Sequence, residues 1–162
     1  MFVLFSTTHE LGRESFNPKT LIDAIEVVDK KGYVSDFYIT PEANYELDNG
    51  LPLRRAKIAP GLELLGLGRR CQDDSWKADG WLVNRLSDTQ ELTFSRQVII
   101  EEHVERSIFG GVGGVAKECI FSLAELKTVF DDFLTQPYSC PNGHWIPFNQ
   151  AFLTYTEFLK NQ

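Results

Sequence analysis

Apolar positions near the N-terminus predict a strand, then an amphipathic helix and a second strand. Residues 1–5 form a short apolar run that does not repeat at helical spacing. Asn17 can cap a helix, Pro18 suits its first position, and Gly32 suits its end. Between these signals apolar side chains recur at helical spacing, at Leu21, Ile22, Ile25 and Val28. The pattern of residues 33–40 then predicts a strand.

The next part of the chain changes from a loop pattern to a strand pattern. Residues 41–60 contain three Pro, two Asn and a Gly, which predicts an irregular connection or a loop that faces a partner. Residues 62–68 form an apolar run of strand character. Gly66 and Gly68 interrupt this run, and glycines inside a strand indicate a bulge or a close backbone contact.

Further β-rich segments follow. Residues 81–86 and 92–102 flank residues of turn composition and predict a hairpin. The glycine-rich residues 110–114 predict a mobile loop or another hairpin, and residues 119–121 predict a short strand. Residues 111–116 match the spacing of a dinucleotide-binding fingerprint. Because a strand-like run follows where that fingerprint needs a helix, we expect no phosphate site here.

Two helices are predicted near the C-terminus. Ser122 and Glu125 have the spacing of a capping box, and residues 122–136 have the strongest amphipathic pattern in the chain. A final helix starting near Pro147 is predicted by the spacing of Phe148, Phe152, Tyr155 and Leu159. Strands grouped between helices favour an α+β fold, with a central, mostly antiparallel sheet on which one N-terminal helix and two C-terminal helices pack.

Composition indicates one folded domain over residues 1–162. The chain is 43% hydrophobic and carries a formal net charge of -7. This charge would repel a nucleic-acid backbone and would favour encounter with a cationic protein. Three cysteines do not make the even set of a disulfide-stapled secreted domain, and no apolar run approaches the ~20 residues of a membrane helix. We therefore expect a soluble, cytoplasmic protein that binds neither nucleic acid nor membrane.

Candidate chemistry is confined to cysteines and histidines. Cys140 and His144 have the spacing of half a zinc site, and Cys119 and His103 could complete it only from separate elements. Cys140 and His144 could also form a nucleophile pair, but the sequence supplies no oxyanion hole. The chain is therefore expected to hold no metal or cofactor and not to be an enzyme. A small hydrolase or transferase that uses Cys140, His144 or His103 remains the alternative.

Acidic residues around one tryptophan form the candidate binding site. Trp76 lies in a polar stretch with Asp73, Asp74 and Asp79, and an aromatic side chain ringed by carboxylates would suit a basic protein surface. Further acidic groups in the long loop could join it, namely Glu42, Glu46 and Asp48. These seven residues are the predicted partner-binding set.

The segment from Trp76 to Glu105, with its hairpin of residues 81–86 and 94–102, resembles the central sheet of immunity proteins from contact-dependent growth inhibition systems. The closing amphipathic segment, Pro147 to Lys160, is similar in position and character to the end of those proteins. The resemblance covers about the second half of the chain.

The resemblance implies a small cytoplasmic bacterial protein without catalytic activity. Such a protein binds the toxic C-terminal domain of a delivered effector and blocks its active site. Many of these toxins are nucleases with basic substrate surfaces, which an acidic inhibitor can occupy. A non-catalytic subunit of another complex is a further alternative, which differs only in the partner.

Overall fold

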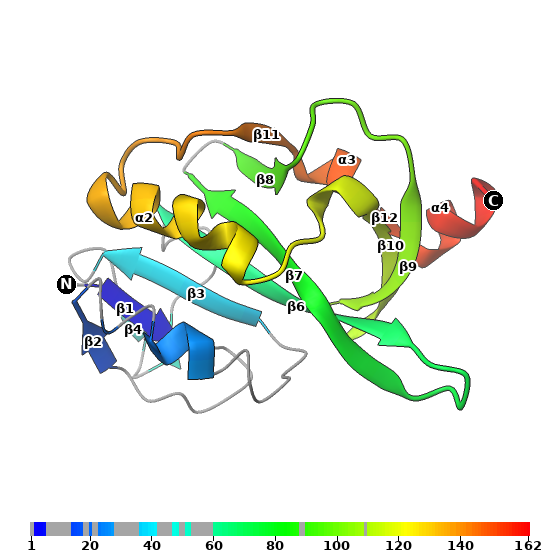
Figure 1. Ribbon diagram of the computed structural model, residues 1–162, viewed down its shortest axis with the longest axis horizontal. Helices are drawn as coiled ribbons and strands as arrows, with labels where there is room; N and C mark the ends of the chain where they lie inside the picture. Colours follow the sequence, from blue (N-terminus) through cyan, green and yellow to red (C-terminus); the bar gives the residue numbers. More distant parts are fainter. Residues whose placement is uncertain are drawn as a thin grey trace.

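The structure is a computed structural model, and it describes residues 2–5, 14–17, 20, 23–27, 36–41, 47–48, 51–52, 60–87, 90–108 and 110–162. Within these residues the fold is α+β, as predicted (Figure 1). Ten of the described strands form one sheet with antiparallel pairing, and two short strands form a separate hairpin. None of the helices in this part of the chain is both long and apolar enough to cross a membrane.

The strands are β1 (Phe2–Phe5), β2 (Glu14–Phe16), β3 (Asp36–Pro41), β4 (Leu47–Asp48), β5 (Leu51–Pro52), β6 (Gly61–Arg70), β7 (Trp76–Leu86), β8 (Glu91–Ser95), β9 (His103–Ile108), β10 (Gly111–Ala116), β11 (His144–Pro147) and β12 (Phe152–Thr154). Residues 20 and 23–27 are also helical. The helices with defined limits are the 3₁₀ turns η3 (Lys117–Cys119) and η4 (Ala124–Leu126), and the α-helices α2 (Lys127–Thr135), α3 (Phe148–Ala151) and α4 (Tyr155–Lys160).

The sheet divides at the middle of β6. One branch has the order β11-β8-β7-β6-β3-β1-β2, and the other branch joins β6 to β9, β10 and β12. Residues 62–65 of β6 pair with β3, whereas Gly68 pairs with Ser107 of β9. The register against β7 shifts between Gly66 and Gly68, so the predicted irregularity is confirmed. At this irregularity β6 stops pairing with β3 and begins to pair with β9, and the sheet curls.

Apolar side chains cover both faces of the two central strands. On one face Leu64 and Val83 belong to a cluster that also contains Phe130 and Phe133 of α2. On the other face the second cluster gathers residues from β6, β7, β10, η3, β11 and α3. The first eight residues of β6 are all buried, as expected for a strand that is covered on both sides.

The N-terminal helix begins at its predicted cap. Thr20 and residues 23–27 are helical, and the backbone N–H of Thr20 donates to Asn17 Oδ1 at 3.0 Å. Ile25, from the predicted apolar stripe, is buried in the first cluster. The other signals predicted for this helix, Pro18, Leu21, Ile22, Val28 and Gly32, lie outside the described residues.

Three predicted limits in the second half of the chain are wrong. The strand expected over 92–102 ends at Ser95, and a loop over residues 96–102 precedes β9. The strand expected at 119–121 does not form. Cys119 ends the 3₁₀ turn of residues 117–119, and Phe121 makes only an isolated bridge with Trp81. The final helix is two short helices separated by β12, because residues 152–154 pair with β10 instead of continuing the helix.

The glycine-rich segment is a strand, not a phosphate loop. It forms β10, which makes a hairpin with β9 and also pairs with β12. A Cβ atom at Gly114 would lie 2.7 Å from Cδ2 of Phe158, so the absence of a side chain allows α4 to pack directly on the strand. A 3₁₀ turn follows β10 where the dinucleotide fingerprint requires a helix.

The predicted capping box is confirmed. The backbone N–H of Ser122 donates to Glu125 Oε1 at 2.9 Å, and the backbone N–H of Glu125 donates to Ser122 Oγ at 3.3 Å. The first of these bonds is the main reason why the pKa of Glu125 is lowered. The four apolar side chains that follow at helical spacing, Leu126, Val129, Phe130 and Phe133, are all buried.

Replacing Ser122 by Ala is expected to lower the free energy of unfolding by about 1 kcal/mol, because the N–H of Glu125 loses its acceptor at the helix start. Urea denaturation of the two proteins measures this difference. Ser139→Ala is the control, because its side chain is exposed and caps no helix. Equal stability of Ser122→Ala and wild type would show that the Ser122 hydroxyl contributes nothing to the fold.

Candidate functional site

A β-hairpin projects from the body of the protein, as Figure 1 shows for the outer ends of β6 and β7. Its strands pair Gly68 with Ala78 and Arg70 with Trp76. The turn is closed by a hydrogen bond from the N–H of Cys71 to the carbonyl of Ser75 at 2.8 Å. We call residues 69–79 the hairpin arm. The regular pairing keeps the arm ordered although most of its residues are exposed.

A cation–π pair holds the tryptophan of the arm. The guanidinium carbon of Arg70 lies 4.8 Å from the centre of the Trp76 ring, directly across the hairpin. Arg70 Nε also donates to Glu105 Oε1 on β9 at 3.0 Å, which raises the pKa of Arg70. Tyr155 of α4 donates its hydroxyl proton to Glu105 Oε2 at 3.1 Å. The partly exposed Trp76 side chain is therefore positioned before any partner arrives.

The structure brings four of the seven predicted binding residues together on the arm. Asp73 accepts hydrogen bonds from both the N–H and the hydroxyl of Ser75, which lower its pKa. Asp74 is 83% exposed at the turn, 3.7 Å from Arg70 Nη1. Asp79 lies 2.9 Å from Nη2 of Arg106. Arginines thus lie among the predicted carboxylates, and the arm has mixed charge instead of a purely negative surface.

The remaining predicted binding residues lie elsewhere in the sequence. Glu42 and Glu46 are outside the described residues. Asp48 belongs to β4, which pairs with β5 in the separate two-stranded sheet.

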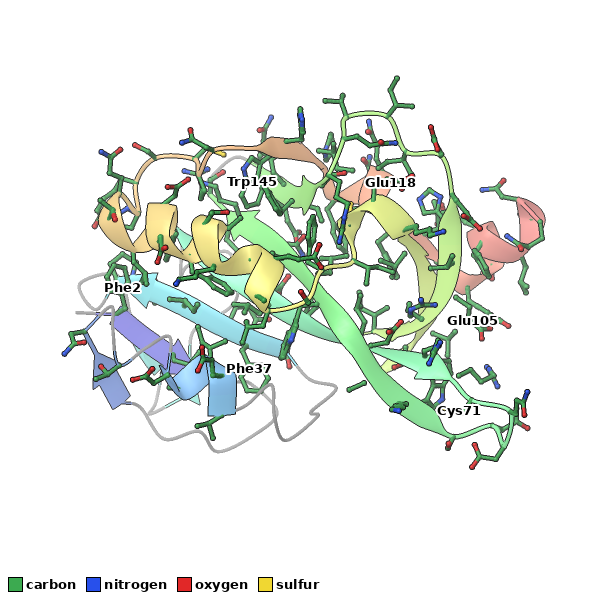
Figure 2. All side chains as sticks on the ribbon, viewed as in Figure 1. Phe2, Phe37, Cys71, Glu105, Glu118 and Trp145 are labelled. Carbon is green, nitrogen blue, oxygen red and sulfur yellow. The ribbon has the colours of Figure 1, made fainter. Side chains whose placement is uncertain are left out.

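Four residues of this surface were missed by sequence reasoning: Arg70, Glu105, Arg106 and Tyr155. Figure 2 shows Glu105 on the same side of the molecule as the tip of the arm near Cys71. Arg70 could have been found from its position opposite Trp76 across the turn. The other three come from β9 and α4, and no local signal in the sequence links them to the arm.

The cysteines and histidines do not form the predicted alternatives. Cys140 is exposed before β11, and no hydrogen bond joins it to His144 in the described part of the chain. Desolvation by the neighbouring protein atoms raises the pKa of Cys140 although the residue is exposed, whereas a nucleophilic thiol needs a lowered pKa. His103 Nε2 lies 2.9 Å from the carbonyl oxygen of Gln150. Among the described residues there is no group of three or more His, Cys, Asp or Glu able to hold a metal ion.

Cys119 lies in the second apolar cluster, where its thiol is fully buried. Burial raises its pKa to about 11, against a smaller opposing effect of a hydrogen bond with Ser95. The neutral thiol is therefore favoured in the folded state. The resulting stability is complete below the unfolded pKa of about 9 and is lost as the pH rises to about 11.

We expect wild type to lose on the order of 2–3 kcal/mol more than Cys119→Ala between pH 8 and pH 11. Urea denaturation of both proteins at several pH values measures this loss, and the variant corrects for every other group that titrates in the range. Parallel pH profiles would contradict the burial of this thiol.

Comparisons with models of protein families, with curated proteins and with solved structures gave no match for this chain.

Proposed function

We propose that this chain is a toxin-neutralising binding protein of the immunity type, which acts without catalysis in the bacterial cytoplasm. The projecting arm with its positioned Trp76 is the observation that carries the proposal. In this proposal the arm contacts the toxic C-terminal domain of a delivered effector, most simply a nuclease, and covers its active site. The resemblance of the second half of the chain to such immunity proteins supports the assignment.

The side chains on the arm are of the types that contribute most to protein–protein binding. Trp, Arg and Tyr are enriched among the residues that dominate binding energy, and Trp76, Arg70 and Tyr155 occur together on this surface. Their mutual contacts order the side chains in advance, which reduces the entropy lost on binding. A surface held in this way can bind a partner without first rearranging.

The net charge of the whole chain, rather than the mixed charge of the arm, supports a basic partner. The chain carries a formal net charge of -7, which would speed encounter with a cationic surface. Two carboxylates of the arm form ion pairs, and Asp74 is the more exposed of them. Its pair with Arg70 is long, at 3.7 Å, and open to solvent. Asp74 can therefore exchange this pair for one with the partner at little cost.

The test is binding to the toxic domain encoded beside this protein. Wild type should bind this domain and restore growth of cells that express it. Trp76→Ala should weaken binding by at least about 30-fold, corresponding to a hot-spot loss of roughly 2 kcal/mol, measured by isothermal titration calorimetry.

Tyr138→Ala is the matched control, because Tyr138 is 66% exposed and lies in the connection after α2, away from the arm. It should bind like wild type. Failure of the wild-type chain to bind the adjacently encoded domain would contradict the proposed function. If wild type binds the domain and Trp76→Ala binds it with the same affinity, the proposed function stands but the arm is not part of the interface.

A further inference from the structure

A row of paired residues crosses four strands and ends at the hairpin arm. Arg70 of β6 pairs with Trp76 of β7. On the other side of β6, Arg70 Nε donates to Glu105 Oε1 of β9 at 3.0 Å. Glu105 in turn pairs with Gly114 of β10. Because paired residues on neighbouring strands place their side chains on the same face of a sheet, Glu105 and Trp76 flank Arg70 on one surface.

The C-terminal helix α4 contacts this row at Glu105. Gly114 has no side chain, so Phe158 of α4 packs directly against β10. This approach brings the hydroxyl of Tyr155 to 3.1 Å from Glu105 Oε2. The two carboxylate oxygens of Glu105 therefore bind different elements, since Oε1 accepts from Arg70 and Oε2 accepts from Tyr155.

Two carboxylates compete for the guanidinium of Arg70. Glu105 Oε1 lies 3.0 Å from Arg70 Nε, and 28% of the Glu105 side chain is exposed. Asp74 Oδ1 lies 3.7 Å from Arg70 Nη1, and 83% of the Asp74 side chain is exposed. The pKa of Arg70 is raised first by its hydrogen bond with Glu105 and then by the charge of Glu105, whereas Asp74 has a smaller effect. Arg70 therefore stays with Glu105 when Asp74 turns to a partner.

The bond to Glu105 also fixes Arg70 over the tryptophan. The guanidinium carbon of Arg70 lies 4.8 Å from the centre of the Trp76 ring. A long side chain has many rotamers, and a hydrogen bond in the free protein removes part of that freedom before a partner binds. Without the Glu105 carboxylate, Arg70 would move toward Asp74, which is the other carboxylate paired with it.

We propose that Glu105 is a positioning residue of the hairpin arm, which holds Arg70 over Trp76. By keeping Arg70, it also leaves Asp74 available to the partner. Glu105 acts through Arg70, and α4 supports it through Tyr155. The effect on binding rests on the proposed function, whereas the order of the two side chains is a property of the free protein.

Glu105→Gln is the main test variant. Gln keeps the length and shape of Glu but has no negative charge, so it holds the guanidinium of Arg70 more weakly. The backbone of the arm should stay in place, because the strand pairing and the 2.9 Å ion pair between Arg106 and Asp79 remain. Thermal unfolding and the backbone amide spectrum of the ¹⁵N-labelled chain check that the variant is folded and that the arm is unchanged.

The free protein gives the first readout. In wild type, the Nε–H proton of Arg70 should exchange slowly with water, because it is bonded to Glu105. In Glu105→Gln this exchange should be at least about tenfold faster. The indole N–H resonance of Trp76 should shift toward its position in Arg70→Ala, which has no cation over the ring. Tyr155→Phe removes only the bond to Oε2 and should change both signals in the same direction by less.

Binding to the adjacently encoded toxic domain gives the second readout, by isothermal titration calorimetry. Glu105→Gln should bind about fivefold or more weakly than wild type, because its arm is less ordered in advance. Asp74→Asn should weaken binding by about threefold when Glu105 is present. In the Glu105→Gln background it should have a smaller effect, because Arg70 then already engages Asp74.

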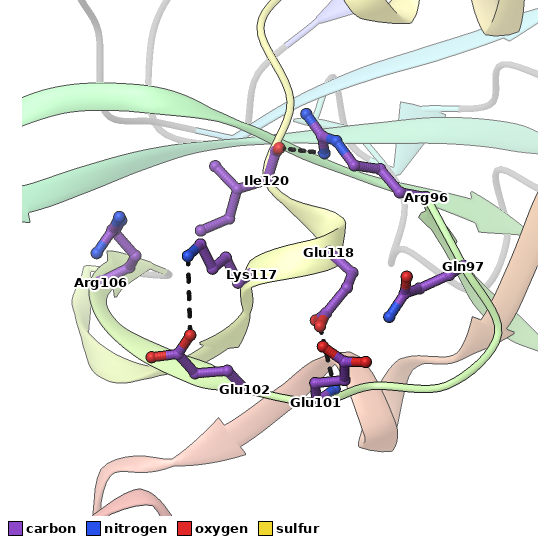
Figure 3. A pocket seen from close by; sticks show the side chains of 8 residues that line it. All are labelled: Arg96, Gln97, Glu101, Glu102, Arg106, Lys117, Glu118 and Ile120. Atoms are coloured by element: carbon purple, nitrogen blue, oxygen red, sulfur yellow. Dashed lines mark hydrogen bonds and ion pairs between the residues drawn. The ribbon is translucent and has the colours of Figure 1, made fainter.

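Glu102→Gln is the matched control, because it removes the same charge from another ion pair. Glu102 pairs with Lys117 at 3.8 Å in the surface pocket that Figure 3 shows. This pair joins the 96–102 loop to η3 and is not part of the arm. The control should bind the toxic domain like wild type and should leave the Trp76 resonance unchanged.

Unchanged Arg70 and Trp76 signals in Glu105→Gln would overturn the proposal, whatever the binding result. Changed signals together with wild-type affinity would also overturn it, because the order of the arm would then not affect binding. An equal loss of affinity in Glu102→Gln would assign the effect to net charge and would contradict a positioning role. If wild type itself does not bind the toxic domain, the proposed function fails, and the signals of the free protein still decide whether Glu105 positions the arm.

Discussion

Phe130→Ala is expected to lower the free energy of unfolding by about 3–5 kcal/mol, because it removes a large ring from the core. The ring of Phe130 is 3% exposed on α2, in the first apolar cluster. Its neighbour Phe133 on the same helix packs against Phe2 of β1, with ring centres 5.9 Å apart. Removing the ring of Phe130 would open a cavity between α2 and the sheet, which these rigid neighbours could fill only in part.

Urea denaturation monitored by circular dichroism gives the comparison. Leu159→Ala is the control, because Leu159 is also helical and apolar but is 53% exposed on α4. Its stability should change by less than about 0.5 kcal/mol beyond the small propensity difference. If Phe130→Ala were as stable as Leu159→Ala, then α2 would not pack on the sheet through this face.

Gly80→Ala is expected to cost on the order of 3 kcal/mol through two separate effects. Gly80 has a φ of +87°, which strains any residue with a Cβ atom. An added Cβ would also lie 2.9 Å from the carbonyl oxygen of Phe121. That carbonyl accepts the N–H of Trp81 at 2.7 Å, so it cannot move away without weakening the bridge that holds Phe121 on β7.

Gly110→Ala separates the two effects. Gly110 has a similar φ of +74°, but nothing lies within 4 Å of the position that its Cβ would take. This variant should lose only about 1–2 kcal/mol through backbone strain, and the difference from Gly80→Ala measures the steric part. Thermal and urea denaturation of both variants provide the measurement. Equal losses would show that the close approach at Gly80 relaxes freely.

Where the deciding atoms lie a few residues apart, the sequence alone predicted the structure correctly. The cap at Asn17 and the capping box of Ser122 and Glu125 depend on side chains that reach backbone groups three residues away. The irregularity between Gly66 and Gly68 follows from the missing side chains themselves. The amphipathic pattern likewise predicted the buried face of α2.

Strand limits were predicted less well because partners distant in the sequence set them. β7 begins at Trp76, five positions before the predicted start at Trp81, because its polar first half pairs with the equally exposed end of β6. The C-terminal segment has a helical pattern, yet residues 152–154 become β12. Gly113 and Gly114 leave room beside β10 for this strand and for α4.

A row of buried polar side chains also depends on sheet register. Glu63, Asn84 and Thr93 lie opposite one another on three adjacent strands. Asn84 Nδ2 donates to Glu63 Oε1 at 2.8 Å, and the hydroxyl of Thr93 donates to Asn84 Oδ1 at 2.6 Å. Taken alone, each of these polar residue types is typical of the protein surface. Only the pairing of the strands supplies the hydrogen bonds that permit their burial.

The candidate site likewise has one part that the sequence predicted and one part that only the tertiary structure assembled. The sequence by itself determined that Asp73, Asp74, Trp76 and Asp79 form one local group, because they share a single turn and strand. Only the tertiary structure brought Glu105, Arg106 and Tyr155 to that group. The physical reason is that charge pairing depends on distances in space. Sheet curvature and strand register fix these distances, whereas the spacing of residues along the chain does not.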